Sequence, residues 1–284
     1  MKNILLTGSN GQVGWELQRT LAPLGRVMAL DRKALDLTDT AAIRNTLRAA
    51  RPDIIVNAAA YTAVDQAEND VELAMRINAQ APEVLAEEAK QLGALLVHFS
   101  TDYVFDGSKT TPYTEEDVPH PINAYGRSKL AGELAIQSVA CRFLIFRTSW
   151  VYGLRGKNFL LTILSLAEER EELRIVDDQI GAPTWSRMIA EATAQALIHP
   201  TAPEGLFHLT SGGAVSWHGF TQAILGQTLH RRTRKPALIA IPSSDYPQLA
   251  ARPRNSRLAC DHLAQTLAIR LPDWRDALDL CVEP

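Results

Sequence analysis

The feature that most constrains the fold is a glycine-rich turn at residues 8–14, with the sequence Gly-Ser-Asn-Gly-Gln-Val-Gly. A short apolar run of strand type precedes the turn, and residues 12–23 have the apolar spacing of a helix. In such a unit Gly8 allows the tight turn, Gly11 lets the backbone approach a pyrophosphate, and Gly14 lets the helix pack closely on the strand. The turn therefore predicts a dinucleotide at the amino end of the first helix.

Apolar runs of strand length alternate with segments of helical spacing through the first half of the chain. The runs cover residues 4–6, 27–30, 53–57, 95–99 and 143–146, and the helical segments cover 12–23, 39–50, 68–91 and 124–139. Asp39 is the expected N-cap of the second helix. Continuously apolar strands joined by helices indicate a parallel sheet covered on both faces. The expected fold class is α/β, a Rossmann-type doubly wound parallel sheet.

The alternation weakens after residue 150, where prolines divide the chain into short elements, at positions 183, 200, 203, 236, 242, 247, 253 and 272. We therefore expect an NAD(P)-binding Rossmann domain over residues 1–150 and, over 151–284, mainly a smaller substrate-binding lobe, some segments of which return to the first domain. Proteins built in this way bind the cofactor on the sheet and the substrate in the cleft between the two parts.

Composition narrows the class of partner. Of the 284 residues, 46% are hydrophobic and 21% charged, which is ordinary for a globular protein, and the formal net charge is -3. The short basic run at 231–235 is typical of a solvated turn, so no nucleic-acid partner is expected. Cys141, Cys260 and Cys281 are widely spaced and include no CxxC pair, which indicates a reduced, cytoplasmic setting. The apolar run at the N-terminus is too short for a signal peptide or a membrane span, so no membrane association is expected.

An acidic residue stands at the end of the second expected strand. An acidic residue at this point can bind the hydroxyls of an adenosine ribose, so Asp31 favours NAD. Arg32 follows directly, and an arginine at this point accepts a 2′-phosphate, which favours NADP. The turn preference of aspartate offers a second explanation for Asp31. The pair leaves NADH and NADPH both open.

A tyrosine and a lysine lie four residues apart at the start of the last expected helix. Tyr125 and Lys129 therefore share one face of that helix. A free tyrosine has a pKa of about 10 and is a poor proton donor near neutrality. A lysine ammonium beside it favours the phenolate and lowers that pKa, so we expect Tyr125 to protonate a carbonyl oxygen as a hydride reaches its carbon. The same lysine can bond the ribose of the nicotinamide.

Hydroxyl groups follow the fourth expected strand, at the sheet edge where open α/β folds bind ligands. The pair Ser100-Thr101 lies there, and a hydroxyl at this edge can polarise the same carbonyl. In chain order the glycine turn, Asp31, the run 57–60, this hydroxyl pair and the Tyr125–Lys129 pair resemble the extended short-chain dehydrogenase/reductase family over nearly the whole chain.

Within that family the resemblance is narrower. Four blocks look like those of the dTDP-4-dehydrorhamnose reductases, at residues 98–107, 147–152, 177–184 and 252–256. This resemblance implies that a nucleotide sugar is the small-molecule partner. The C4 ketone of dTDP-4-dehydro-L-rhamnose would be reduced by NADPH or NADH to give dTDP-L-rhamnose.

The resemblance also implies roles for individual residues. Catalysis would rest on Thr101, Tyr125 and Lys129. The cofactor would be bound by Gly8, Gly11, Gln12, Val13, Gly14, Asp31, Asp36, Leu37, Ala60, Tyr61, Thr62, Tyr125 and Lys129. The nucleotide sugar would be met by Thr101, Asp102, Trp150, Arg252 and Asn255. Without the resemblance, Trp150 would be interpreted as a core or lid aromatic and Arg252 as part of a solvated loop.

No metal ligand is assigned, because the seven histidines are scattered without a ligand-like spacing. Some members of the family are described as joining subunits through magnesium held by carboxylates. Glu16 matches one such position, but Arg187 stands where another carboxylate is expected. Magnesium is therefore doubtful, and a homodimer stays open.

Rival functions differ in what they need. A nucleotide-sugar 4,6-dehydratase carries an Asp-Glu pair after the threonine, whereas Tyr103 follows Asp102 here, so elimination is not expected. A nucleotide-sugar epimerase on the same fold is not excluded by these residues. A non-catalytic regulatory subunit of the methionine adenosyltransferase type also has this fold, but it need not keep Thr101, Tyr125 and Lys129 together.

Overall fold

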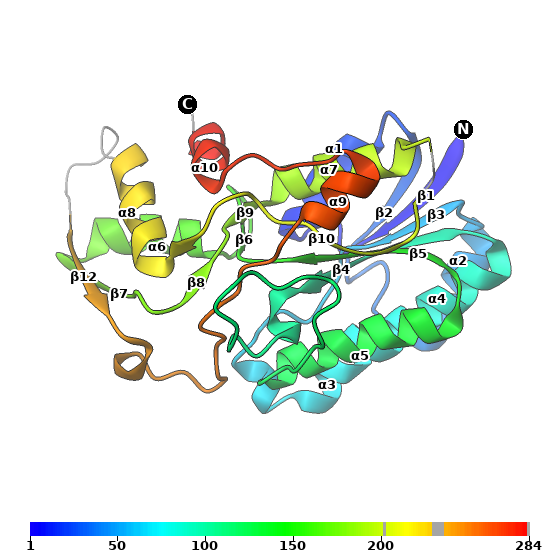
Figure 1. Ribbon diagram of the computed structural model, residues 1–284. Coiled ribbons are helices and arrows are strands. Elements are labelled where there is room, and N and C mark those ends of the chain that lie inside the picture. The colour runs from blue at the N-terminus through cyan, green and yellow to red at the C-terminus, as the bar shows by residue number, and fades with distance from the viewer. Residues whose placement is uncertain (201–202, 229–235, 283–284) are drawn as a thin grey trace.

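The computed structural model describes residues 1–200, 203–228 and 236–282 (Figure 1). The basic run at 231–235 lies outside the described residues. Among the described helices, none is long and apolar enough to cross a membrane.

A six-stranded parallel sheet forms the centre of the molecule, in the spatial order β2-β1-β3-β4-β5-β10. Its strands are β1 (Lys2–Thr7), β2 (Gly25–Leu30), β3 (Ile54–Asn57), β4 (Leu95–Thr101), β5 (Arg142–Thr148) and β10 (Gly205–His208). The chain order reverses between β1 and β3, which creates the crevice at the carboxyl ends where such sheets bind ligands. The expected α/β, Rossmann-type fold class is confirmed.

Helices cover both faces of the sheet (Figure 1). One face buries apolar side chains of α1 (Gln12–Leu21), α7 (Ser186–Ile198) and α9 (Asp261–Leu267). The other buries those of α2 (Thr40–Ala50), α4 (Ala81–Leu92) and α5 (Ala124–Val139). Asp39 caps α2 as expected, because its side chain accepts a hydrogen bond from Ala42 N. Burial on both faces explains why the strands are continuously apolar.

The single helix expected over 68–91 is wrong in detail. The structure has a 3-10 turn (Gln66–Glu68), the short helix α3 (Val71–Met75), a π-helical turn (Arg76–Gln80) and then α4. Pro82, in the first turn of α4, lacks the N–H that a regular helix would donate to the carbonyl of Asn78. The wider turn lets the Asn78 side chain bond both Tyr61 N at 2.8 Å and Tyr61 O at 3.0 Å. This π turn therefore fixes the segment that follows β3.

Most of the remaining elements pack beside the carboxyl end of the sheet. Helices α6 (Phe159–Glu169), α8 (Trp217–Thr228) and α10 (Trp274–Val282) share a separate apolar core with the strand pair β7 (Glu172–Val176) and β12 (Ala237–Ile241). The short elements are β6 (Val151–Tyr152), β8 (Ile180–Gly181), β9 (Thr184–Trp185), β11 (Val215–Ser216) and 3-10 turns at Asp102–Val104 and Ser243–Asp245. Segments after residue 150 also return to the sheet, since β10 pairs with β5 and α7 packs on α1.

Candidate active site

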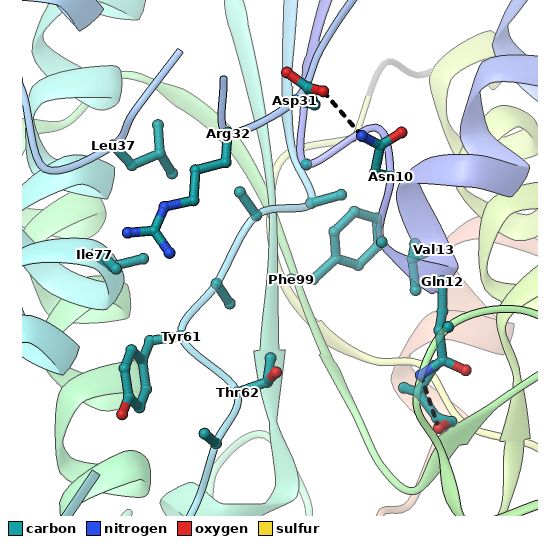
Figure 2. A pocket seen from close by; sticks show the side chains of 18 of the residues that line it. Asn10, Gln12, Val13, Asp31, Arg32, Leu37, Tyr61, Thr62, Ile77 and Phe99 are labelled. Atoms are coloured by element: carbon teal, nitrogen blue, oxygen red, sulfur yellow. Dashed lines mark hydrogen bonds between the residues drawn. The ribbon is translucent and has the colours of Figure 1, made fainter. Parts of the chain in front are cut away.

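A cavity of about 650 Å³ opens at the carboxyl ends of β1, β2, β3 and β4, above the glycine turn (Figure 2). The turn, the ends of these strands and the start of α5 supply its walls. Of the residues expected to bind the cofactor, those that line it are Gly8, Gly11, Gln12, Val13, Asp31, Asp36, Leu37, Ala60, Tyr61, Thr62, Tyr125 and Lys129. Residues spread over more than a hundred positions thus meet at one crevice.

The glycine turn is built for close approach. Gly8 has φ 71°, and a Cβ on it would lie 2.6 Å from Ala59 N. Gly11 is the N-cap of α1 and provides no side-chain cap, so the first N–H groups of the helix are left for a ligand. Gly14 does not line the cavity. A Cβ there would lie 2.1 Å from Gly8 O, so its role is the close packing of helix on turn.

The end of β2 presents its two charged side chains differently (Figure 2). Asp31 turns toward Asn10, which donates to its Oδ2 at 2.9 Å, while its Oδ1 accepts from the backbone N–H groups of Lys33 and Ala34. These hydrogen bonds, with that from Ala34 foremost, lower the pKa of Asp31. The Arg32 side chain is 77% exposed and extends over the cavity, with Asp36 at 3.9 Å. At the end of β2, the Arg32 guanidinium is therefore free to bind a ligand, whereas the Asp31 oxygens are already hydrogen-bonded.

Tyr125 and Lys129 lie one turn apart at the start of α5, whose N-cap Asn123 accepts from Gly126 N at 2.7 Å. Burial raises the pKa of Tyr125, and a hydrogen bond with Thr101 lowers it in part. The expected lowering of this pKa by the lysine is not found, because Lys129 Nζ contacts His98 and Phe99 O of β4 instead. The phenol is therefore protonated at neutral pH, which is the form a proton donor needs.

Lys129 is almost fully buried where it lines the cavity. Its Nζ donates to Phe99 O at 2.7 Å and lies 3.1 Å from His98 Nε2. Burial lowers the pKa of Lys129 to about 8, and the Glu133 carboxylate raises it in part. Two contacts inside the protein leave further N–H capacity for the cavity.

Two buried hydroxyls in the cavity wall fit a polar ligand. Ser100 Oγ and Thr148 Oγ1 lie at the ends of β4 and β5 and have no hydrogen-bond partner within the protein. A buried polar atom without a partner is costly, so a ligand with amide or ribose groups would satisfy both. The uncapped helix α1 and the open Arg32 suit phosphates. The residues present therefore fit a nicotinamide dinucleotide.

The residues expected to meet the sugar nucleotide lie beside this cavity and not in its wall. Thr101 donates to Asp102 Oδ1 at 3.0 Å, and Thr101 reaches Tyr125. Burial raises the pKa of Asp102 to about 6, although hydrogen bonds from Ser256 and Thr101 lower it in part. Thr101 and Asp102 thus stand next to the candidate proton donor.

Trp150 has φ 46° and stacks on Trp217 of α8, with ring centroids 3.4 Å apart. A Cβ on Gly181 would lie 2.4 Å from the Trp150 ring, so this glycine makes room for it. The indole is therefore held by stacking and by a strained, left-handed backbone conformation.

Arg252 and Asn255, the remaining residues expected to meet the sugar nucleotide, lie on the loop at residues 251–257. Arg252 donates to Asp65 Oδ2 at 2.8 Å, and its guanidinium lies 5.9 Å from the centre of the Tyr103 ring. Asn255 donates to Lys109 O and Thr111 O, both at 2.8 Å. Its hydrogen bonds fasten a neighbouring loop, so the geometry gives no support to direct contact between Asn255 and the substrate.

The sequence patterns did not point to several residues of the cavity wall: Asn10, Leu35, Ile77, Phe99, Ser100 as a cofactor residue, Thr148, Val151, Gly156 and Lys157. Lys157 and Gly156 come from the loop before α6, which Asn158 ties to Gln12 Oε1 at 2.9 Å. No local motif marks this loop. Its polar glycine-containing sequence between two apolar segments was the only signal.

Glu16 and Arg187 lie near each other, and Arg187 donates to Glu191 at 3.0 Å. Within residues 1–200, 203–228 and 236–282, no three histidine, cysteine, aspartate or glutamate side chains gather as a metal site would require. The homodimer that the sequence left open stays an open alternative.

Comparisons with known proteins agree with this site. The family model described as the RmlD substrate binding domain matches residues 1–284. A dTDP-4-dehydrorhamnose reductase of Burkholderia thailandensis is 50% identical, covering 98% of this chain and 97% of that protein. One from Escherichia coli K12 is 45% identical, covering 96% and 94%.

Solved structures show the same relationship. A dTDP-4-dehydrorhamnose reductase of Bacillus anthracis in complex with NADP has a TM-score of 0.93 at 35% identity, covering 99% of this chain and 98% of that chain. A UDP-glucose 4-epimerase of Thermus thermophilus, at 20% identity and a TM-score of 0.83, shares the fold alone. Sequence, fold and site therefore agree that the chain belongs to the dTDP-4-dehydrorhamnose reductase family.

Proposed function

We propose that this chain reduces the C4 ketone of dTDP-4-dehydro-L-rhamnose to give dTDP-L-rhamnose, using a reduced nicotinamide cofactor. The observation that carries the proposal is that Tyr125 and Lys129 line a cavity that fits a dinucleotide, while Thr101, just outside its wall, hydrogen-bonds with Tyr125. A binding-only relative of the same fold would have no need of a protonated tyrosine beside a buried lysine.

When bound, the cofactor supplies the hydride. The protein's part is to place the ketone between Thr101 and Tyr125 and to give its oxygen a proton from the Tyr125 hydroxyl. Thr101 holds that hydroxyl in place, and Lys129, which keeps N–H capacity beyond its contacts with His98 and Phe99 O, would bond the ribose of the cofactor. The protonated state of Tyr125 in the free protein suits the direction of reduction.

We place the dinucleotide along the carboxyl edge of the sheet, with its phosphates on the first turn of α1. The sugar nucleotide would lie between this edge and the elements around α6 and α8, against Trp150 and Asp102. The division into a cofactor domain and a substrate lobe follows from this placement. We propose a cytoplasmic location, because the three cysteines are free, as they are in a reducing compartment.

The test is to follow the absorbance of NADPH and of NADH in separate reactions with purified protein and dTDP-4-dehydro-L-rhamnose, and to identify the product by NMR. The proposal expects consumption of at least one cofactor together with formation of dTDP-L-rhamnose. Consumption of neither would refute it and favour a regulatory role. Interconversion of nucleotide sugars without net cofactor consumption would instead favour an epimerase.

A further inference from the structure

A row of buried polar side chains crosses the carboxyl end of the sheet beneath the candidate catalytic lysine. Strand register places Thr7 of β1 beside Asn57 of β3, and Asn57 beside His98 of β4. Thr7 Oγ1 lies 2.7 Å from Asn57 Oδ1, and the Asn57 amide lies 3.1 Å from His98 Nδ1. His98 Nε2 then lies 3.1 Å from Lys129 Nζ. All four residues are at most 2% exposed.

We propose that His98 is the positioning residue for Lys129: its Nε2 holds the lysine nitrogen, and its tautomer, set with the Asn57 amide, follows the charge of that lysine. The role in turnover rests on the proposed function, because Lys129 matters to catalysis only if the reductase reaction is the right one. The hydrogen-bond arrangement itself does not depend on that reaction.

The coupling follows from the imidazole's two nitrogens. Burial lowers the pKa of His98 well below its usual range, so the ring is neutral and has one N–H donor and one acceptor. When Lys129 is an ammonium, Nε2 must accept, so Nδ1 carries the proton. Asn57 must then turn its amide oxygen to the ring and give up the hydrogen bond that this oxygen accepts from Ala59 N at 3.3 Å. When Lys129 is a free amine, Nε2 can donate to it, and Asn57 keeps its amide nitrogen toward Nδ1.

Other charges near Lys129 do not replace this contact. Glu133, one turn along α5, raises the lysine pKa but is itself bound by Arg147 of β5 at 2.6 Å. Asp102, after β4, acts on Tyr125, the neutral neighbour on α5. From β4 the backbone offers only Phe99 O as a second acceptor. Among these neighbours, His98 is the side chain whose ring nitrogen lies within hydrogen-bond distance of Lys129 Nζ.

A matched pair of substitutions separates the two ends of the ring. His98→Gln can put an amide near the place of Nε2, where it can turn its oxygen to an ammonium or its nitrogen to an amine. His98→Asn can put an amide only near the place of Nδ1, so it keeps the contact with Asn57 and loses that with Lys129. Both are uncharged and of similar size, and thermal unfolding of each controls for general damage.

The main readout is the pKa of Lys129, followed by NMR of its 13Cε in lysine-labelled protein, with Lys129→Met to assign the signal. Losing an acceptor disfavours the ammonium, so His98→Asn should lower this pKa by about one unit or more, whereas His98→Gln should stay within about half a unit. The alkaline limb of kcat/KM should move to lower pH in His98→Asn alone. Equal pKa values in wild type and both variants, or equal shifts in both, would overturn the proposal.

A second measurement needs no variant. In 15N-histidine-labelled wild-type protein, His98 Nε2 should be the unprotonated nitrogen at pH values below the lysine pKa. A ring that keeps its proton on Nε2 while Lys129 is charged would contradict the proposal. If the wild-type protein fails to oxidise either cofactor with the sugar nucleotide, the proposed function fails, and these NMR results still decide the role of His98.

Discussion

At the residue scale, the proposed chemistry depends on the hydroxyl of Tyr125. Tyr125→Phe keeps the ring and removes the proton donor, so kcat should fall about 10²–10⁴-fold while the Kd for NADPH stays within about two-fold. Stopped-flow turnover and cofactor fluorescence measure the two quantities. Tyr103→Phe is the matched control, because Tyr103 packs edge-on against Tyr125 at 5.9 Å but has no proposed chemical role. Equal kcat in the wild type and Tyr125→Phe would contradict the assignment.

Asp102 makes folding stability depend on pH. Its pKa in the folded protein is raised from 3.8 to about 6, so between these values the folded state holds a proton that the unfolded state releases. The free energy of unfolding therefore falls as pH rises from 3.8 to about 6 and levels off above that value. Asp102→Asn removes this loss and should raise that free energy by about 2–3 kcal/mol at pH 8, with little change at pH 4.

Urea unfolding of both proteins at the two pH values measures this difference. The same loss of stability in Asp102→Asn at pH 4 and pH 8 would show that lost hydrogen bonds, and not the buried charge, dominate at this position.

Arg32 is the residue expected to favour a 2′-phosphate. Because the Asp31 oxygens are already bonded to Asn10 and to backbone N–H groups, the open guanidinium is left to decide cofactor preference. Arg32→Ala should raise KM for NADPH about ten-fold and KM for NADH less than about two-fold. Lys33→Ala is the control, since Lys33 does not line the cavity. Equal changes in both KM values would argue against the assignment.

The sequence predicted the residues whose chemistry is local. A tyrosine and a lysine four apart must share a helix face, and the turn glycines have a steric reason at each position. It could not predict what Lys129 binds, because His98 and Phe99 O reach it only through the packing of α5 on β4. The prediction that Lys129 lowers the pKa of Tyr125 was wrong for that reason. Trp217 as a partner for Trp150 is likewise a product of tertiary structure.

At the element scale, the strands and helices of the first half followed from apolar spacing, and α5 begins and ends where expected. The π turn before α4 did not, because its cause is one proline whose effect depends on helix context. The sixth strand, β10, was not foreseen either. An edge strand of four residues is defined by its pairing with β5 rather than by its own pattern.

The close packing of α1 on the glycine turn predicts that a side chain at Gly14 destabilises the protein and weakens cofactor binding. Gly14→Ala would place a Cβ 2.1 Å from Gly8 O, so α1 must move off the turn. We expect a loss of about 2 kcal/mol or more in the free energy of unfolding and a weaker Kd for NADPH. Gly226→Ala in α8 is the control, since a Cβ there meets nothing within 4 Å. That change should be neutral or stabilise by up to about 1 kcal/mol.

Denaturant unfolding and cofactor titration of the two variants provide the comparison. If Gly14→Ala matches the wild type in both, the close approach of helix and turn does not matter to the site.

At the scale of the whole molecule, the sheet and the elements around α6 and α8 both border the crevice at the carboxyl ends of the strands. The loop before α6 lines the cofactor cavity through Lys157 and Gly156, and Asn158 ties it to Gln12 on α1. Trp150, which follows β5, stacks on Trp217 of α8. A dinucleotide on the sheet and a sugar nucleotide against this side would therefore meet at Tyr125.

The central claim, direct hydride transfer to the sugar at this meeting point, is tested most directly with a cofactor deuterated at the transferred position of its nicotinamide. The protein would convert dTDP-4-dehydro-L-rhamnose in ordinary water, and NMR would locate the deuterium in the product. We predict dTDP-L-rhamnose with deuterium at C4 alone, with a proton from the solvent pool on the C4 oxygen. Product that carries no deuterium at C4, or deuterium at any other ring carbon, would contradict the account.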